Sequence, residues 1–476
     1  MPGSLPRQLT AVRNASLPDG RIVDLSIAGS TVGDVVPAGR PAARETTGPD
    51  ETSLDLTGWL LLPAPAEPHA HLDKALSFDA IDPPLGDLPS AIAAWRAHTA
   101  TMTVDEIAGR ARAQALAMLA SGITAIRSHV DVLGADGPPN SCASVEHATR
   151  GARALIQVRE ELAGLLDLEL VALAGPQTPD RHVEAVLDLG VDLVGGAPHL
   201  APDPAADLSR LLAIAEWREI GADLHTDENL DGPVTLDAFA RAVRNWPRGR
   251  TRTAGHCVRL GTLDAARRGA VIRDVRDADL GIVTLPITNL YLQGWEHPVA
   301  TPRGLPPLRE LLDAGVRVGA GADNVRDPFN PVGRSDALET ASLLVTAGHL
   351  SPTEAYDLVS HGAREVMGLA PAGAAPGAQA DFLAIRAANL ADAIASAPAE
   401  RIVIHRGRIV AATEVRRALP AVGPGGVNPH PAAAFPVRTT TAPPPPAVVP
   451  PSAVPRPPAH APAPVPARVP TAAPAS

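Results

Sequence analysis

The chain of 476 residues carries 41 basic and 52 acidic side chains, which gives a formal net charge of −11. This acidic balance predicts no nucleic-acid partner and no anionic membrane partner, because both bind to a basic protein face. The sequence contains a single lysine, Lys74. Schiff-base enzymes, P-loop nucleotide sites and metal pairs bridged by a carbamylated lysine all need a lysine, so each of these mechanisms would depend on Lys74.

The cysteine content and the N-terminus favour a cytoplasmic protein. The two cysteines, Cys142 and Cys257, do not make a disulfide framework. The first residues lack the apolar run of a signal peptide, and no run of about 18 apolar residues is present that would span a bilayer. We therefore expect a cytoplasmic protein with a small-molecule partner, and a homo-oligomer stays open.

Both ends of the chain carry short β-like segments. The first part contains LTAVRNASL, RIVDLSIAG and SLDLTGWLLLP, and the stretches ADFLAIRA and RIVIHRGRIVAA follow the main body. We expect residues 1–62 and 370–418 to form one composite domain, a small β-sandwich. Residues 421–476 are rich in proline and alanine and cannot bury enough apolar surface to become ordered, so we expect a disordered tail.

Between these ends, short apolar runs alternate with longer amphipathic stretches. One amphipathic stretch begins at the capping residues Thr103 and Glu106 and ends at Gly122. Strands that alternate with helices predict an α/β fold, and eight such units predict a (β/α)8 TIM barrel over residues 63–369. A doubly wound open sheet is the alternative, but no glycine-rich dinucleotide turn follows the first strand. The candidate strands lie in LLLPAPAEPHAH, ITAIRSHVDV, LELVALAGPQ, VDLVGGAPH, ADLHTDE, RTAGHC, GIVTLPITN and RVGAGADN.

Histidines and acids gather where these strands end, which is the functional face of a barrel. His69 and His71 alternate on the first strand and therefore point to the same side. The fifth, sixth and eighth strands end in His225, His256 and Asp323. Imidazole and carboxylate groups suit one divalent ion, zinc or iron(II), and leave a position for water.

The chemistry expected of such a site is hydrolytic. A bound divalent ion lowers the pKa of water from about 16 to about 7 and so supplies hydroxide as the nucleophile. Asp323 could accept the proton of that water, and Glu228 could carry a proton to a ring nitrogen or a leaving amine. His256 is either a fourth imidazole ligand or a donor that holds the hydroxide. This arrangement favours cleavage of a C–N bond over redox chemistry.

Two further histidines, His129 and His199, lie at the ends of strands 2 and 4. They could line the pocket, but a packed or hydrogen-bonded role fits them equally well. The other histidines follow no such pattern, and we expect them to be surface or structural residues.

In chain order, the motifs resemble those of a known family. They are EPHAHLDK, SHVDV, the pair Pro176-Gln177, GGAPH, HTDE, AGHC, TLPITNLYLQG and GADNVRDPFNPVG. As a set they resemble the amidohydrolase superfamily, and within it the cytosine deaminase-like metal-dependent hydrolases, over nearly all of residues 8–415. The resemblance implies one metal ion, zinc or iron, held by His69, His71, His225 and Asp323.

The resemblance also implies individual roles. Glu228 would shuttle protons, His256 would polarise or steady the hydroxide, and Gln177 would read the amide edge of the ring. The binuclear members of the superfamily carry a bridging lysine on strand 4, where this chain has GGAPH, and this agrees with one metal ion. Lys74 would then be a loop or lid contact rather than a catalyst.

Three departures from cytosine deaminase leave the substrate open. Asn324 replaces a second aspartate, Phe329 replaces a tryptophan, and Thr226 replaces a cysteine; we take Asn324 and Phe329 as substrate contacts. The predicted function is hydrolytic deamination at a C–N bond of a small nitrogen heterocycle, cytosine or a related cyclic amidine. The alternatives are a ring-opening cyclic amidohydrolase, an N-alkylamino-triazine hydrolase and, from another class, a non-catalytic metal-binding scaffold with a proline-rich interaction tail.

Overall fold

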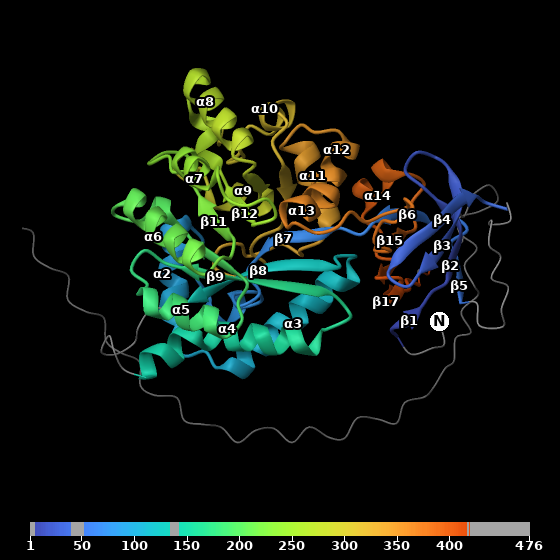
Figure 1. The fold of residues 1–476 in the computed structure, drawn as a ribbon, viewed down its shortest axis with the longest axis horizontal. Coiled ribbons are helices and arrows are strands. Elements are labelled where there is room, and N and C mark those ends of the chain that lie inside the picture. Colours follow the sequence, from blue (N-terminus) through green and yellow to red (C-terminus); the bar gives the residue numbers. More distant parts are fainter. Residues whose placement is uncertain (1–4, 40–51, 134–141, 417, 419–476) are drawn as a thin grey trace, which may run out of the picture. The chain divides into compact units, whose positions relative to one another are not determined.

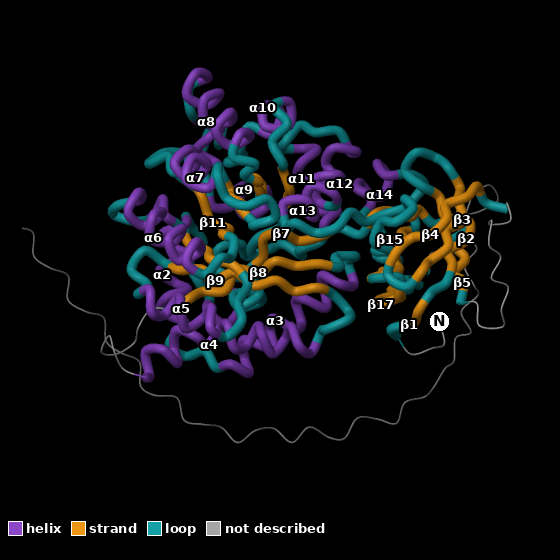
Figure 2. The backbone as a smooth tube through the Cα atoms, in the orientation of Figure 1, coloured by secondary structure: helices purple, strands orange, loops and turns teal. Residues whose placement is uncertain are grey.

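The structure is a computed structural model that describes residues 5–39, 52–133, 142–416 and 418. Residues up to Val415 form one compact unit. Two β-sheets and the helices packed beside them build this unit (Figure 1, Figure 2). The expected tail, residues 421–476, lies outside the described residues.

Eight parallel strands form a barrel in which neighbours along the chain are also neighbours in the sheet. A parallel bridge between Ala70 and Asp323 joins the first strand to the segment after the last one, and Asp323 N–H donates to the carbonyl of His69 at 3.0 Å. The (β/α)8 barrel predicted from the sequence is therefore confirmed. Its strands are β7 (Ala66–Ala70), β8 (Ala125–Val132), β9 (Asp167–Ala174), β10 (Leu193–Gly196), β11 (Ala222–Thr226), β12 (Arg252–His256), β13 (Gly281–Thr284) and β14 (Val318–Ala320).

Helices cover the outside of the barrel strands (Figure 2). The sequence sets their limits: the Thr103 hydroxyl accepts from Glu106 N–H at 3.2 Å at the start of α3, and Gly122 follows the helix with a φ of +113°. Apolar side chains of strands and helices form one continuous core. The helices are α1 (Phe78–Ile81), α2 (Leu88–Thr99), α3 (Val104–Ala120), α4 (Cys142–Glu161), α5 (Asp180–Asp188), α6 (Pro204–Trp217), α7 (Leu236–Val243), α8 (Ala265–Asp277), α9 (Pro286–Leu292), α10 (Leu308–Asp313), α11 (Ala337–Thr346), α12 (Pro352–Val359), α13 (His361–Val366) and α14 (Leu390–Ser396), with 3-10 turns η1 (Pro198–Leu200) and η2 (Val258–Thr262).

Strands from both ends of the chain form a second sheet of nine strands, which we call the chain-end sheet. Its centre joins β6 from the N-terminal part to β15 from the C-terminal part in antiparallel register. The strands of both chain ends form one continuous hydrogen-bonded sheet, and a separate apolar cluster packs against it. The expected small β-sandwich is therefore built from a single sheet. The strands are β1 (Arg7–Gln8), β2 (Ala11–Ser16), β3 (Ile22–Ala28), β4 (Thr31–Pro37), β5 (Ser53–Asp55), β6 (Leu60–Pro63), β15 (Phe382–Ile385), β16 (Arg401–His405) and β17 (Arg408–Thr413).

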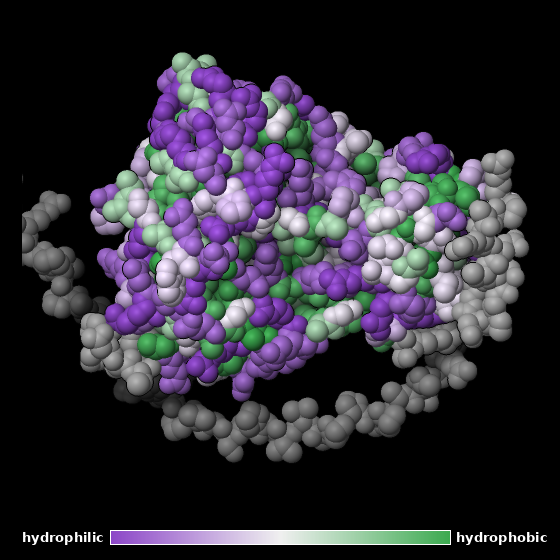
Figure 3. All heavy atoms as spheres, in the orientation of Figure 1, coloured by the Kyte–Doolittle hydropathy of each residue, from purple (hydrophilic) through white to green (hydrophobic). Residues whose placement is uncertain are grey.

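Among the helices that the structure describes, none is long and apolar enough to cross a bilayer. Figure 3 shows one face of the molecule, on which hydrophilic residues cover the area around α7 and α8 and apolar residues occupy smaller areas between them.

Candidate active site

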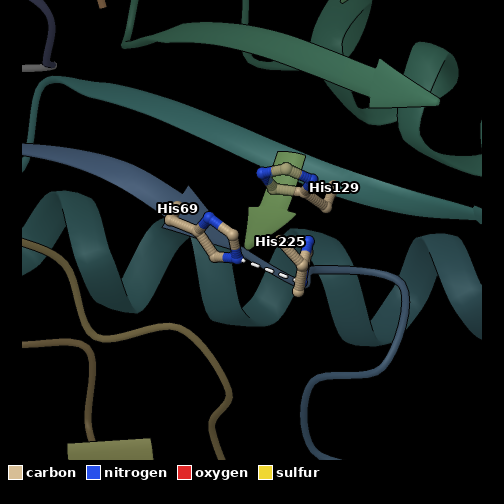
Figure 4. Close-up of side chains that lie close together, drawn as sticks. All are labelled: His69, His129 and His225. Carbon is tan, nitrogen blue, oxygen red and sulfur yellow. Dashed lines mark hydrogen bonds between the residues drawn. The ribbon is translucent and has the colours of Figure 1, made fainter. Parts of the chain in front are cut away.

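Four of the predicted metal ligands meet at the carboxyl ends of three strands. The Nε2 atoms of His69 and His71 each lie 3.2 Å from Nε2 of His225. Oδ1 of Asp323 lies 3.2 Å from His71 Nε2 and 3.7 Å from His69 Nε2. All four side chains are buried. Figure 4 shows His69 and His225 pointing toward each other from β7 and β11, with His129 beside them.

The backbone at the strand ends holds these groups in place. His256 and Asp323 adopt left-handed φ values of +67° and +64°, which are rare for residues with a side chain and cluster at functional sites. Glu67 lies on β7, and its carboxyl group accepts from His69 N–H at 3.2 Å and from Ala322 N–H at 2.9 Å. Burial raises the pKa of Glu67 to about 8. Glu67 therefore ties the first and last strands together directly beneath the ligands.

The donor atoms suit a divalent ion. Both carboxylate oxygens of Asp323 and Nδ1 of His69 and of His225 have no hydrogen-bond partner although they are buried. Burial lowers the pKa of His69, His71 and His225 well below the usual value, so the three rings are neutral and present lone pairs. Neutral imidazoles and a carboxylate are the ligands that zinc and iron(II) prefer. These residues can therefore hold a metal ion.

His129 belongs to the same cluster, whereas the sequence left its role open. Its ring centroid lies 4.0 Å from that of His69 and 4.8 Å from that of His225. Its Nε2 lies 3.6 Å from Oδ1 of Asp223, and Arg127 donates to the other oxygen of Asp223 at 2.8 Å. Burial alone would raise the pKa of Asp223, but His129 and Arg127 lower it to about 2. This charged network supports the histidine cluster from inside the barrel.

Glu228 and His256 lie beside the proposed ligands. Oε1 of Glu228 lies 3.7 Å from Nδ1 of His256, and Nε2 of His256 lies 4.0 Å from Oδ2 of Asp323. Burial raises the pKa of Glu228 to about 7 and lowers the pKa of His256 to about 4. The Nδ1 atom of His256 is 2.9 Å from Oδ1 of Asn289, so its N–H donates to Asn289 and its Nε2 keeps a free lone pair.

His199 also lies in this region. Its Nε2 is 3.9 Å from Oε2 of Glu228, and its Nδ1 is 3.3 Å from the carbonyl oxygen of His225. Burial lowers the pKa of His199 to about 4. A neutral His199 therefore faces the far side of the Glu228 carboxyl group, so two imidazoles flank this acid.

Lys74 lies in the loop after β7, and its side chain is buried. Its Nζ donates to Oδ1 of Asp131 at 2.7 Å and lies 3.1 Å from Nδ1 of His71. Burial lowers its pKa, but the carboxylates of Asp131 and Asp73 outweigh this effect and hold the pKa above the usual value. Nζ also lies 5.6 Å from the ring centroid of Trp95. Lys74 is thus a charged residue in the lining of the cavity, next to the proposed ligand His71.

A cavity of about 630 Å³ opens from the ligands and is lined by the carboxyl ends of barrel strands, the loops that follow them, and residues of α2, α4 and α5. The three predicted substrate contacts all line it, but they differ in exposure: Gln177 is exposed, Phe329 is half-buried and Asn324 is buried. Asn324 Nδ2 donates one of its two N–H groups to Oδ2 of Asp327 at 2.7 Å, so its amide oxygen and the second N–H are left for a ligand. The sequence did not single out Trp95, Arg96, His147 and Arg181, which also line the cavity.

Helix-borne lining residues give no local signal in the sequence. Trp95 and Arg96 lie on α2, and His147 lies on α4, neither of which carries a recognisable motif. Asn289 lies within the motif TLPITNLYLQG. The motif indicated that this segment belongs to the family pattern, but it did not indicate the contact of Asn289 with His256.

Comparison with known proteins decides the family. The sequence model of the amidohydrolase family matches residues 91–411 of this chain. The chain belongs to the amidohydrolase family. The chain is also similar to a pterin deaminase of Rhizobium rhizogenes, at 31% identity over 401 residues, which covers 81% of this chain and 87% of the relative.

Two solved structures share the fold of this amidohydrolase. The 5-methylcytosine deaminase of Klebsiella pneumoniae, liganded with 5-fluorocytosine, gives a TM-score of 0.73 at 23% identity over 86% of this chain and 99% of the other. The N-isopropylammelide isopropylaminohydrolase of Burkholderia multivorans gives a TM-score of 0.68 at 28% identity over 84% and 98% of the two chains. The family and the ligand cluster together make this chain a metal-dependent hydrolase with deaminase homologues.

Proposed function

We propose that this amidohydrolase is a hydrolytic deaminase that acts on a C–N bond of a small nitrogen heterocycle. The observation that carries the proposal is the position of Glu228, a buried acid with a pKa raised to about 7, whose carboxyl group lies 3.7 Å from His256 at the edge of the ligand cluster. Similarity to a pterin deaminase at 31% identity supports deamination of an amino-substituted ring. Cytosine, pterin and related cyclic amidines are the substrates that we propose to examine first.

We assign His69, His71, His225 and Asp323 as the ligands of one divalent ion, zinc or iron(II). When bound there, the ion would act as a Lewis acid and make a water molecule acidic enough to attack at neutral pH. Strand 4 supports a single ion, because a Cβ at Gly195 would lie 2.6 Å from Val171 Cγ1 and 3.2 Å from the carbonyl oxygen of Asp223. A bridging side chain therefore has no room at that position.

We assign Glu228 the proton transfer. A carboxyl group with a pKa near neutrality can both take a proton from the attacking water and give it to a ring nitrogen or to the departing amine. His256, neutral and with a free Nε2 lone pair, would accept a hydrogen bond from that water and so orient it. Asp323, whose Oδ2 lies 4.0 Å from Nε2 of His256, would accept a proton from that water.

The same proposal places the heterocycle among Gln177, Asn324 and Phe329. The amide of Gln177 would pair with the amide edge of the ring, and the free oxygen of Asn324 would accept from a ring N–H or an amino group. Phe329 would cover one face of the ring, because its own ring is apolar and already faces the cavity.

The test is a substrate panel offered to the metal-loaded protein. The panel contains cytosine, 5-methylcytosine, pterin, N-isopropylammelide and one cyclic amide, and chromatography with mass detection measures free ammonia, free amines and ring-opened acids. We expect ammonia from an amino-substituted ring. Isopropylamine from N-isopropylammelide would favour the alternative of N-alkylamino hydrolysis, which the similarity to the Burkholderia enzyme supports. A carboxylate without ammonia would indicate ring opening. If no compound reacts at one bound metal equivalent, the proposed substrate class is wrong.

The role of Glu228 is tested by Glu228→Gln. We expect this variant to bind metal nearly normally and to lose turnover by about 10²-fold or more, because an amide cannot carry the proton. Glu365→Gln, at an exposed acid on α13 far along the chain from the site, is the matched control and should leave turnover unchanged. Turnover retained in Glu228→Gln would refute the shuttle role.

A further inference from the structure

Two arginines at the cavity have no partner among the described residues. Arg96 lies on α2 and Arg181 lies in the first turn of α5, and both are exposed and line the same cavity as the proposed ligands. Most other described arginines donate to a carboxylate or to a backbone carbonyl. The structure therefore keeps two cationic groups uncommitted on the wall of a cavity in a chain of net charge −11.

The acids near Arg181 are already engaged elsewhere. On α5, Asp180 accepts from Arg210 at 2.8 Å, Asp188 pairs with Arg218 at 2.8 Å, and Glu184 also pairs with Arg218. On α2 no acid occurs within the helix, and its N-cap Asp87 accepts from Ser90 N–H at 3.1 Å. No acid of either helix is thus left to neutralise the two arginines.

The acids that line the cavity do not neutralise them either. Asp131 accepts from Lys74 at 2.7 Å and from Trp95 at 2.6 Å. Glu228 and Asp323 are buried at the ligand end of the cavity. Taken as a whole, the lining of the cavity is mainly apolar. The same mainly apolar cavity is therefore lined by buried acids beside the proposed ligands and by two exposed arginines.

We propose that the substrate heterocycle carries an anionic substituent, a carboxylate, that Arg96 and Arg181 bind while the ring lies over the ligands. A cavity of about 630 Å³ has room for two fused rings or for one ring with a substituent. Guanidinium groups bind carboxylates through two parallel hydrogen bonds, which a neutral ring cannot reproduce. This inference rests on the proposed deaminase function and specifies its substrate class.

The test compares matched ligands with and without the carboxylate. We would measure the binding of pterin and 6-carboxypterin, and of 5-methylcytosine and 5-carboxycytosine, to the metal-loaded Glu228→Gln protein, which should bind without turnover. We expect the carboxylated member of at least one pair to bind about 10-fold or more tightly, as a charged hydrogen-bond pair predicts. Raising the salt concentration should reduce this advantage, because the arginines are exposed.

Arginine variants test whether the two arginines cause the tighter binding of the carboxylated ligands. In the Glu228→Gln background, Arg96→Gln combined with Arg181→Gln should remove the preference for the carboxylate and change the affinity for the neutral member less than about 2-fold. Arg273→Gln, at an exposed arginine on α8 that does not line the cavity, is the control and should change neither affinity.

Equal binding of both members of each pair, or an equal loss for both in the double variant, would overturn the inference. This result is separate from the proposed function, which depends on turnover by the unmodified enzyme. Carboxylate selectivity without any C–N cleavage would support the anion site and refute the deaminase.

Discussion

Asp131 is shared by two buried donors that come from different parts of the chain. Lys74 follows β7 and donates to Oδ1 at 2.7 Å, while Trp95 of α2 donates to Oδ2 at 2.6 Å. The carboxylate of Asp131 thus connects the loop that carries His71 to the helix that lines the cavity. Since Lys74 Nζ also lies 3.1 Å from His71 Nδ1, the position of this carboxylate affects the orientation of a proposed ligand.

We expect Lys74→Met to lower the free energy of unfolding by about 1.5–3 kcal/mol, because it leaves a largely buried carboxylate without its charged donor. Asp131→Asn should cost a similar amount. Combining the two changes should cost less than the sum, because neither group is then left unpaired. Urea denaturation of the metal-loaded protein measures all three values. Strict additivity would mean that the pair contributes nothing.

Asn289 acts through His256 and is a positioning residue. Its side-chain oxygen accepts from Nδ1–H of His256 and so sets the tautomer of that ring. Asn289→Leu removes the acceptor for His256 Nδ1–H and should lower kcat by about 10- to 100-fold, with a smaller effect on KM. Asn289→Asp retains an acceptor and should restore part of the activity. The added negative charge should raise the pKa of His256 above its value of about 4, so the acidic limb of the pH–rate profile should move to higher pH. A profile that does not move would argue against this role.

At the scale of elements, β10 has no room for a side chain at its two glycines, Gly195 and Gly196. A Cβ added at Gly196 would overlap Cδ1 of Leu211 on α6 and lie 3.1 Å from the carbonyl oxygen of Ala174 on β9. α6 therefore packs directly on the backbone of β10. This close approach positions the loop that follows β10, in which His199 faces Glu228.

Gly196→Ala should destabilise the protein by about 1–3 kcal/mol, because the extra methyl group forces α6 away from the strand. Gly109→Ala is the matched control: Gly109 is exposed in the middle of α3, and a Cβ there meets nothing within 4 Å. The control should stabilise the protein by about 0.5–1 kcal/mol through helix propensity. Thermal unfolding should show a lower melting temperature for Gly196→Ala and a higher one for Gly109→Ala. Equal shifts would contradict the packing argument.

The eight barrel strands and the residues at their ends could be predicted from the sequence, because period-2 apolar runs and polar strand ends are local patterns. The first candidate strand shows a limit of this method. LLLPAPAEPHAH is one apolar run, yet Leu60–Pro63 pairs with β15 in the chain-end sheet and Ala66–Ala70 pairs with β8 in the barrel. The pairing of a strand depends on partners more than 300 residues away, for which the run itself holds no information.

The same physical reason limits the prediction of the site. His69, His71, His225 and Asp323 were found because each ends a strand, and parallel strands end on one face. Trp95 and Arg96 line the cavity from α2, and Asn289 contacts His256 from α9. On a helix, a residue that faces a cavity and a residue that faces solvent recur with the same period in the sequence. Their roles follow only from the way the helices are packed.

At the scale of the whole molecule, two buried ion pairs join the chain-end sheet to the barrel. Arg401 of β16 contacts Asp336, the N-cap of α11, at 2.7 and 3.0 Å. Arg364 of α13 lies 3.1 Å from Asp381, which directly precedes β15. Because both pairs are buried, separation of the sheet from the barrel would expose four charges that are now neutralised in pairs.

We expect Arg401→Met to lower the free energy of unfolding by about 3–5 kcal/mol, since it leaves the Asp336 carboxylate buried without its partner. The combined change Arg401→Met and Asp336→Leu should recover most of this loss, because the pair is replaced by apolar side chains. Calorimetry measures both effects. If the sheet and the barrel depend on each other as the ion pairs indicate, the wild-type protein should unfold in one transition, and Arg401→Met should broaden or split it.

The single lysine gives this protein a built-in chemical reporter. Apart from the amine at the chain start, Lys74 is the one primary amine in the sequence, and its side chain is 3% exposed on the wall of the cavity. Amine-acylating reagents should therefore label the folded protein at Lys74 only slowly, when the cavity opens to admit them. A ligand that fills the cavity should slow this labelling further. Mass spectrometry of one peptide would then follow occupancy and opening of the site without any assay of turnover.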